Sequence, residues 1–197
     1  MLILGRFSQK GDTLIEVLFA VTVFSLVAVG SLSIMNQGTT VAQRSLETTL
    51  VRQEIDAQAE TLRFIHDSYI AAYPNGIVAG EPSSRWIDIV TKSQGVSSAS
   101  TFGTCTPPSG AFILNTKTAT LEDATKLVSV VPTYSQLRYL PDGTMTAEGI
   151  WIEAVQSTAA GGTSSKSIDF HIRACWDSIG QAAPMTLGTI VRLYEPL

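Results

Sequence analysis

The sequence predicts an α+β protein in which one long N-terminal helix packs on an antiparallel β-sheet head domain. Three observations predict this. Residues 12–73 contain no proline, and the first third of this stretch is almost wholly apolar. The stretch after it, from Arg44, is polar and rich in helix formers. Beyond Pro74, turn residues separate short runs of β-branched and aromatic residues, and a helix followed by such runs is typical of an α+β fold.

The length and composition are those of an acidic chain of ordinary size. With 197 residues, it can form one globular domain with an appendage. Its net charge is −4 and its pI is about 5.1, so it offers no basic surface of the kind that binds nucleic acid. We therefore expect no nucleic-acid partner.

Residues 14–35 form a segment that can cross a membrane. A helix over residues 17–35 is about 28 Å long, close to the ~30 Å hydrocarbon core of a bilayer. Arg6 and Lys10 are the only charges in the first eleven residues, and two positive charges favour a cytoplasmic N-terminus with an exported C-terminal part. Three interpretations remain: a secretory signal cleaved near residues 28–30, an uncleaved anchor, or a leader cut ahead of the apolar run.

Glu16 is the residue that separates these interpretations. Thr13 and Glu16 have the spacing of a capping box, which stabilises a helix start by about 1 kcal/mol. However, an acidic side chain costs ~2.5–3.5 kcal/mol at mid-bilayer and usually has a cationic partner. This helix provides no such partner near Glu16.

Residues 10–16 resemble the prepilin processing motif of type IV pilins and type II secretion pseudopilins. The resemblance implies that a prepilin peptidase cuts after Gly11 and that the new N-terminal residue, Asp12, is methylated. It also implies that Glu16 neutralises the N-terminal amine of a neighbouring subunit during assembly. The chain then divides into a cleaved leader (1–11), a long helix (12–70) with its membrane or filament-core segment at 14–35, and an extracytoplasmic head (71–197).

Asp12 departs from the family pattern, which usually has phenylalanine or another apolar residue there. Asp12 and Glu16 are four residues apart and lie on one helix face, where their charges repel. We expect methylation of Asp12 to be inefficient and the subunit to be a minor one.

The expected function is that of a structural subunit of a type IV pilus or a secretion pseudopilus. Its expected partners are other pilin subunits, the prepilin peptidase, the assembly platform and the membrane. The chain is expected to cross the bacterial cytoplasmic membrane once before assembly, and afterwards to lie in an extracellular pilus or a cell-envelope pseudopilus. The alternative is a membrane-anchored or secreted binding or adhesion module, and an exported enzyme is a more distant one.

The second part of the helix is expected to be amphipathic. An apolar stripe at helical spacing fits packing against the head, and opposite charges four residues apart support the exposed face. Gly30 and Gly38 indicate either a segment that bends on assembly or close helix packing. The stripe consists of Val51, Ile55, Ala59, Leu62 and Tyr69, and the charge pairs are Arg52–Asp56 and Arg63–Asp67.

In the head, residues 73–76 form a turn signal, and Ser83 or Ser84 can cap a short helix over residues 86–92. Residues 95–110 and 159–166 are expected to be loops, and the three tryptophans are expected to be core residues. Strands are expected at 112–114, 127–131, 137–140, 149–155, 168–174 and 189–194.

The two cysteines, Cys105 and Cys175, lie on the exported side of the predicted topology. An oxidising compartment favours a disulfide between them over two free thiols. In the chain-entropy model, a bridge closing a loop of this size adds roughly 4 kcal/mol.

No catalytic, cofactor or metal motif is apparent. His66 is interpreted as a surface or groove residue. His171 and Cys175 have a spacing that could join a metal site, but no second pair completes it. Residues 162–167 lack the spacing of a phosphate-binding loop. The sequence therefore predicts no enzyme, no cofactor and no metal.

Overall fold

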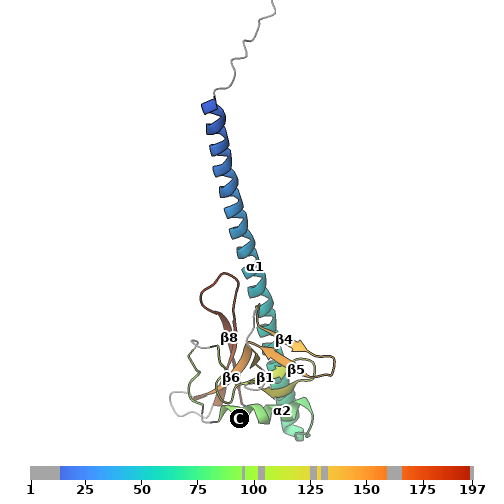
Figure 1. Cartoon of the computed structure of the whole chain (residues 1–197). Helices are drawn as coiled ribbons and strands as arrows, with labels where there is room; N and C mark the ends of the chain where they lie inside the picture. The colour runs from blue at the N-terminus through green and yellow to red at the C-terminus, as the bar shows by residue number, and fades with distance from the viewer. Residues whose placement is uncertain are drawn as a thin grey trace, which may run out of the picture. The chain divides into compact units, whose positions relative to one another are not determined.

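A computed structural model of the chain describes residues 14–94, 96–101, 105–124, 128–129, 133–158 and 166–195 (Figure 1). The predicted leader, including the cleavage positions Gly11 and Asp12, lies outside the described residues. The chain divides into two compact units, Met1–Gln43 and Arg44–Leu197, and each is described by itself.

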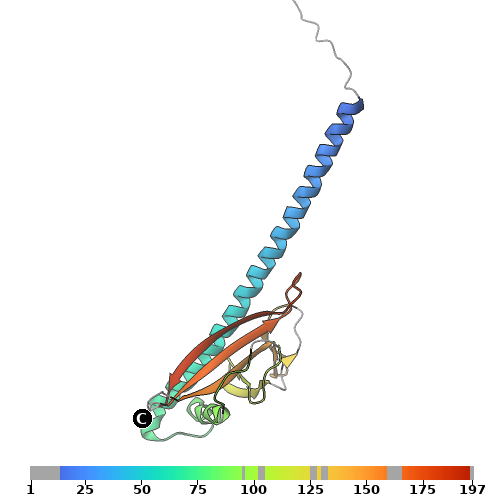
Figure 2. The ribbon, with the colours of Figure 1, turned by 90° about the vertical axis from the view of Figure 1, so that its left-hand side faces the viewer.

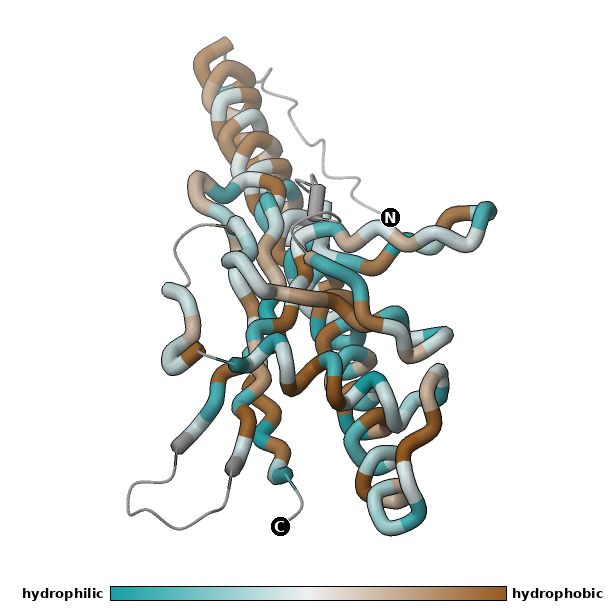
Figure 3. The backbone as a smooth tube through the Cα atoms, turned by 90° about the horizontal axis from the view of Figure 1, so that it is seen from below, coloured by the Kyte–Doolittle hydropathy of each residue, from teal (hydrophilic) through white to brown (hydrophobic). Residues whose placement is uncertain are grey.

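Helix α1 (Leu14–Ala72) spans 59 residues without interruption, as the absence of proline predicts. It is followed by a short 3-10 helix, η1 (Tyr73–Asn75), and then by Gly76 at φ +93°, so the predicted turn ends the helix. The hydrophobic colour in Figure 3 is nearly continuous along the first part of α1 and alternates with teal along the second. The two parts therefore meet different surroundings, as the sequence predicts.

The second part of α1 buries one face in the head. The predicted stripe is confirmed, because its first four members are at most 4% exposed and Tyr69 packs partly buried against the same core. The ion pairs differ from the prediction: Arg63 pairs with Glu60, whereas Asp67 lies 3.2 Å from His66 Nδ1. Burying each large aliphatic side chain contributes roughly 1.5–3 kcal/mol, so the stripe stabilises the contact far more than any surface ion pair does.

Helix α2 (Pro82–Ser93) begins four residues before the predicted start, because Pro82 is well suited to a first helical turn. Ser83 and Ser84 lie inside that turn, so the prediction that one of them is the N-cap is wrong. Glu81 occupies the cap position without a side-chain cap bond. Trp86 is 1% exposed and packs its ring against His66 and Phe170, so α2 closes one end of the core.

Among the described residues, the strands form two sheets and confirm the predicted α+β class. The larger sheet is antiparallel, in the order β2-β1-β6-β7-β8, and the smaller has the order β3-β5-β4. The pair β3–β5 is parallel, an exception to the predicted antiparallel pairing. The strands are β1 (Phe112–Asn115), β2 (Thr120–Asp123), β3 (Val128–Ser129), β4 (Gln136–Tyr139), β5 (Met145–Glu148), β6 (Ile150–Thr158), β7 (Lys166–Trp176) and β8 (Met185–Tyr194).

The sequence does not predict β2 and β5. Each is four residues long and contains acidic residues or alanine, which have weak strand propensity. They form because short turns return the chain alongside β1 and β4. The other six strands lie at predicted positions, although the part of the predicted strand 127–131 outside β3 is not among the described residues.

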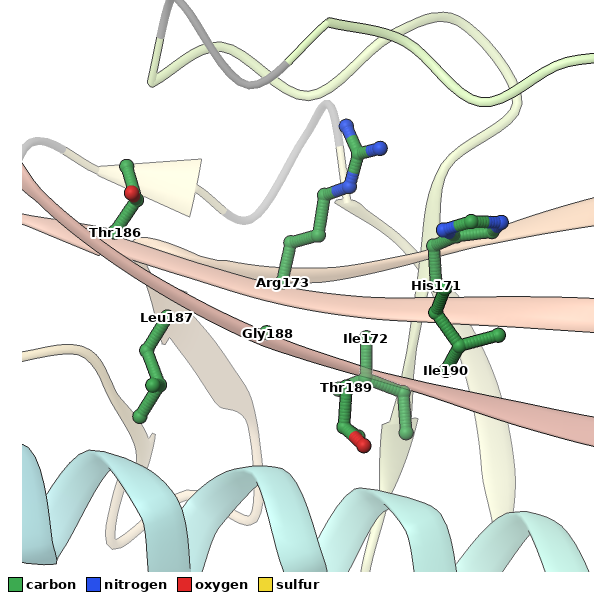
Figure 4. Close-up of a pocket in the computed structure, with 8 residues that line it drawn as sticks. All are labelled: His171, Ile172, Arg173, Thr186, Leu187, Gly188, Thr189 and Ile190. Carbon is green, nitrogen blue, oxygen red and sulfur yellow. The ribbon is translucent and has the colours of Figure 1, made fainter.

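Alternation along β7 gives the larger sheet an apolar inner face and a polar outer face. Its even-numbered residues from Ile168 to Ala174 are at most 1% exposed. Its odd-numbered residues include Asp169, His171 and Arg173. Figure 2 shows the larger sheet beside the second part of α1, and Figure 4 shows Ile172 directed toward α1 while His171 and Arg173 point away from it.

A buried amide fixes the position of α1 against the sheet. Gln58 is fully buried, and its Nε2 donates to the carbonyl of Leu114 at 2.7 Å. Its Oε1 accepts from the Leu114 N–H at 3.0 Å. Because β1 pairs with β6 only at Phe112, this side chain replaces the missing strand partner of Leu114.

We predict that Gln58→Leu destabilises the protein by about 2–4 kcal/mol, because it leaves a buried N–H and a buried C=O without partners. Urea unfolding followed by circular dichroism measures the change. The matched control is Gln53→Leu on the exposed face of α1, where we expect a change within about 0.5 kcal/mol. Equal effects of the two substitutions would contradict the role assigned to Gln58.

Candidate membrane and assembly segment

Residues 14–43 of α1, of which 14–35 are predominantly apolar, form a helix that no described residue covers. All of them are exposed except Ala28 and Thr40, which are half-buried. Large aliphatic and aromatic side chains in this stretch are 44–78% exposed. The helix is long and apolar enough to cross a membrane by length and composition. A soluble helix hides such a surface against a core, so this exposed apolar surface is compatible with a membrane anchor or a signal.

Five hydroxyl side chains in this segment, those of Thr22, Ser25, Ser31, Thr39 and Thr40, bond to the helix itself. Thr22 donates to the carbonyl of Phe19 at 2.7 Å, Ser25 to Val21 at 2.8 Å, and Ser31 to Val27 at 2.8 Å. A hydroxyl bonded in this way needs no water, so it is tolerated in lipid or among packed helices. These hydroxyl side chains therefore fit an apolar environment.

Glu16 lies in the first turn of α1, at the position that the sequence predicts to be functional. It is exposed and borders a shallow groove formed with Val17, Ala20, Val21 and Phe24. Among the described residues no cation contacts it, and the next basic residue along the helix is Arg44, roughly 42 Å away at 1.5 Å per residue. Its charge therefore has no counter-charge within the described part of the chain.

The head begins with a polar clamp, formed by Arg44, Glu47, Trp176 and Ser178. Glu47 is 9% exposed and accepts hydrogen bonds from Trp176 Nε1 at 3.1 Å and Ser178 Oγ at 2.6 Å. One turn earlier, Arg44 Nη2 donates to the carbonyls of Ile179 and Gly180, at 3.4 and 3.1 Å. The clamp therefore ties the β7–β8 connection to the start of the buried part of α1.

Sequence reasoning misses this clamp, although one signal could have revealed Glu47. It lies four residues before Val51, so it continues the apolar stripe by one helical turn. A carboxylate on an otherwise apolar stripe indicates a buried polar contact. Its partners Trp176 and Ser178 are more than 125 residues away, and no local pattern connects them.

A second buried polar network lies on the outer face of the larger sheet. Arg173 Nη1 lies 3.0 Å from Glu153 Oε1, and both side chains are at most 7% exposed. Trp151 Nε1 also donates to Glu153, at 2.8 Å. Ser100 bonds Glu153 through its N–H and its hydroxyl, each at 2.8 Å, and accepts from Arg173 at 2.8 Å. The Ser100 hydroxyl donates to Glu153 on β6 and accepts from Arg173 on β7. The network therefore holds residues 96–101 on the sheet.

The predicted disulfide is present, and it joins the same surface. Cys105 and Cys175 are bonded, with a Cα–Cα distance of 5.5 Å across 70 residues of sequence. The bond removes Cys175 from any metal site with His171. Among the described residues, no three histidine, cysteine or acidic side chains gather as a metal would require.

The remaining histidine and the tryptophans occupy structural positions. The His66 side chain is 14% exposed, and its Nε2 is 2.9 Å from the carbonyl oxygen of Tyr194. Trp86, Trp151 and Trp176 are at most 2% exposed, which confirms that they belong to the core.

Two groups on the outer face have lowered pKa values. Two hydrogen bonds from Arg192, at 2.6 and 2.7 Å, hold the pKa of Asp169 below its usual 3.8. Burial lowers the pKa of His171 below 6.5, and the Arg173 guanidinium lowers it further, against the opposing effects of Glu153 and Asp169. The folded head therefore favours a neutral His171 and an ionised Asp169.

We predict that Glu47→Leu destabilises the head by about 2–3 kcal/mol, because two buried donors lose their acceptor. Glu47→Gln keeps an acceptor oxygen for both donors, so we expect a loss of less than about 1 kcal/mol. Urea unfolding monitored by tryptophan fluorescence measures both. Equal losses in the two variants would show that the carboxylate charge, and not the acceptor geometry, matters.

We predict that acidification destabilises the head in two steps. A folded pKa below the unfolded value means that stability is fully present above the unfolded pKa and is lost as pH falls through the folded pKa. His171 therefore acts below pH 6.5 and Asp169 below pH 3.8. Melting temperatures across this range should fall, and His171→Gln should remove the first step but not the second. A first step that persists in His171→Gln would refute the assignment.

Comparisons with protein-family models, with curated proteins and with solved structures find no match for this chain. Two features of the chain's own residues bear on its function. The first is an exposed apolar helical segment that begins near Glu16. The second is a head in which the polar clamp holds the later part of the same helix.

Proposed function

We propose that the chain is a structural subunit, of the minor class, of a type IV pilus or a secretion pseudopilus. In this proposal it is held in the cytoplasmic membrane before assembly by the apolar part of α1. It enters the filament when that helix packs among the helices of neighbouring subunits.

The observation that carries the proposal is the uncompensated carboxylate at the head of the uncovered helix. Residues 14–35 expose a long apolar surface, yet Glu16 lies at one end of this segment without a cation among the described residues. A carboxylate entering lipid or a helix bundle needs a positive partner. If the leader is cut after Gly11, each subunit gains a free amine at Asp12, four residues before Glu16 in the sequence, and the Glu16 of a neighbour can pair with it.

The proposed mechanism follows from these groups. The prepilin peptidase removes residues 1–11 and the assembly platform moves the subunit. Glu16 neutralises the amine of the adjacent subunit and so fixes the register of two helices. Packing of the apolar side chains supplies most of the cohesion, since each buried methylene contributes about 0.8 kcal/mol.

The polar clamp supports this role in the head. An assembling helix can move the head only if the two are firmly joined. Arg44 and Glu47 join α1 to the β7–β8 connection at the first buried turn, and Gln58 joins it to β1 further along. The head is therefore fixed to α1 at separate points along its second part.

We predict that Glu16→Ala and Glu16→Gln each lower incorporation into filaments by tenfold or more, because neither can neutralise a neighbour's amine. Incorporation is measured by immunoblotting of sheared filament fractions against whole-cell levels. Glu60→Gln, an exposed acid of the same helix in the head, is the matched control and should incorporate normally. Wild-type incorporation of both Glu16 variants would refute the assembly role.

N-terminal sequencing of the mature protein separates this proposal from the alternative of an anchored or secreted binding module. A mature start at Asp12 supports the pilin-like subunit. A start at Ser31 supports ordinary secretion, and a start at Met1 supports an uncleaved anchor; either would contradict the proposal.

A further inference from the structure

Among the described residues, no strand pairs with the outer edge of strand β8. It is the last strand of the larger sheet and pairs with β7 over ten consecutive residues, without a bulge. It contains no proline and no lysine, and its one charged residue, Arg192, is paired with Asp169. Proteins commonly protect long edge strands with such residues or with bulges, because unpaired backbone groups bind another strand.

The ladder determines which backbone groups face outward. The Cys175 N–H donates to Gly149 at 2.7 Å, so odd-numbered residues of β7 bond toward β6. Antiparallel ladders alternate, so even-numbered residues of β7 bond to Leu187, Thr189 and Val191. The even-numbered residues of β8 therefore direct N–H and C=O groups away from the sheet. The carbonyl oxygen of Tyr194 points outward in this alternation, and His66 bonds to it. This bond covers the edge of β8 only at its C-terminal end.

A hollow of about 310 Å³ lies on this strand (Figure 4). Gly188 has no side chain opposite Arg173, and the hollow is bordered by His171 and Ile190. Ile190 is 60% exposed. Gly188 therefore leaves a space on the outer face. Ile190, the next residue of β8 on that face, presents an exposed aliphatic side chain.

We propose that a second copy of this chain pairs antiparallel with this edge, with the two-fold axis at Thr189. In that register the outward-facing residues form hydrogen-bonded pairs, and Gly188 of each copy lies opposite Ile190 of the other. Each Ile190 side chain then enters the hollow beside the other copy's Gly188. The pairing is self-complementary, as a two-fold interface requires.

Charges also fit a second copy. Arg192 lies opposite Thr186 in this register, so no like charges face each other across the edge. The Arg192 guanidinium remains bonded to Asp169 of its own chain, at 2.6 and 2.7 Å. The interface therefore consists of backbone bonds, threonine side chains and the two buried Ile190 side chains.

The direction of β8 relative to α1 determines how the two copies are oriented in this pairing. The start of the buried part of α1 contacts residues 176–180, just before β8, whereas His66 contacts Tyr194 at the end of β8. Strand β8 therefore runs in the same direction as α1, and antiparallel pairing opposes the second parts of the two α1 helices. On the proposed function, the interface joins subunits that face each other from two fibres or two surfaces. The pairing itself does not depend on that function.

Disulfide trapping of the full-length chain in detergent tests the register. Thr189→Cys places two cysteines at a non-hydrogen-bonded pair, with Cα atoms about 4.5 Å apart, within reach of a disulfide. Thr186→Cys is the matched control, because its two copies lie six residues apart along the paired strands, about 20 Å. We expect Thr189→Cys to form covalent dimers at least tenfold faster, since the native cysteines are already bonded.

A second measurement is the dimer dissociation constant from light scattering. Ile190→Lys should weaken the dimer at least tenfold, whereas Ile179→Lys, an equally exposed position outside β8, should not. A dimer held by the apolar helix, or an edge that binds a different protein, would leave Thr189→Cys uncrosslinked and overturn the proposal. Equal crosslinking of both cysteine variants would also overturn it. Neither readout involves Glu16, so failure here is distinguishable from failure of the proposed function.

Discussion

The head depends on the contact between one face of α1 and the inner face of the five-stranded sheet. Apolar side chains from Val51 to Ile65 supply the energy of this contact, because they are almost completely buried against the sheet. Apolar packing alone allows a helix to slide by a turn. Gln58 removes that freedom, since its amide can satisfy Leu114 in one position only. Glu47 has the same effect at the other end of the contact.

The two parts of α1 differ in how much of their surface is buried, and the proposed function is based on this difference. The helix is continuous, yet residues 14–43 bury almost nothing while the second part is embedded in the head. Thr22, Ser25 and Ser31 in the first part bond back to the backbone, and Glu16 is the one charged residue of this part. An exposed apolar surface headed by one charge is the feature on which we base the proposal of an assembling subunit.

The outer face of the larger sheet is stabilised over β6 and β7, whereas β8 is exposed. The Glu153–Arg173 network and the disulfide hold the chain over β6 and β7. Strand β8 extends beyond this cover, so its edge and the hollow at Gly188 stay accessible. The buried ion pair adds specificity more than net stability, because desolvation offsets much of its attraction.

The sequence by itself determined the features that depend on local periodicity. These are the length of α1, its change from apolar to amphipathic, the turn at residues 73–76 and the positions of six strands, two of which show clear alternation. It also marked Glu16 as a charge out of place. Only the tertiary structure decided which polar residues are buried, because Gln58 and Leu114 are 56 residues apart and Glu47 and Trp176 are 129 apart. Strands β2 and β5 form through pairing, and the edge of β8 is open because of strand order, so neither is visible in a local pattern.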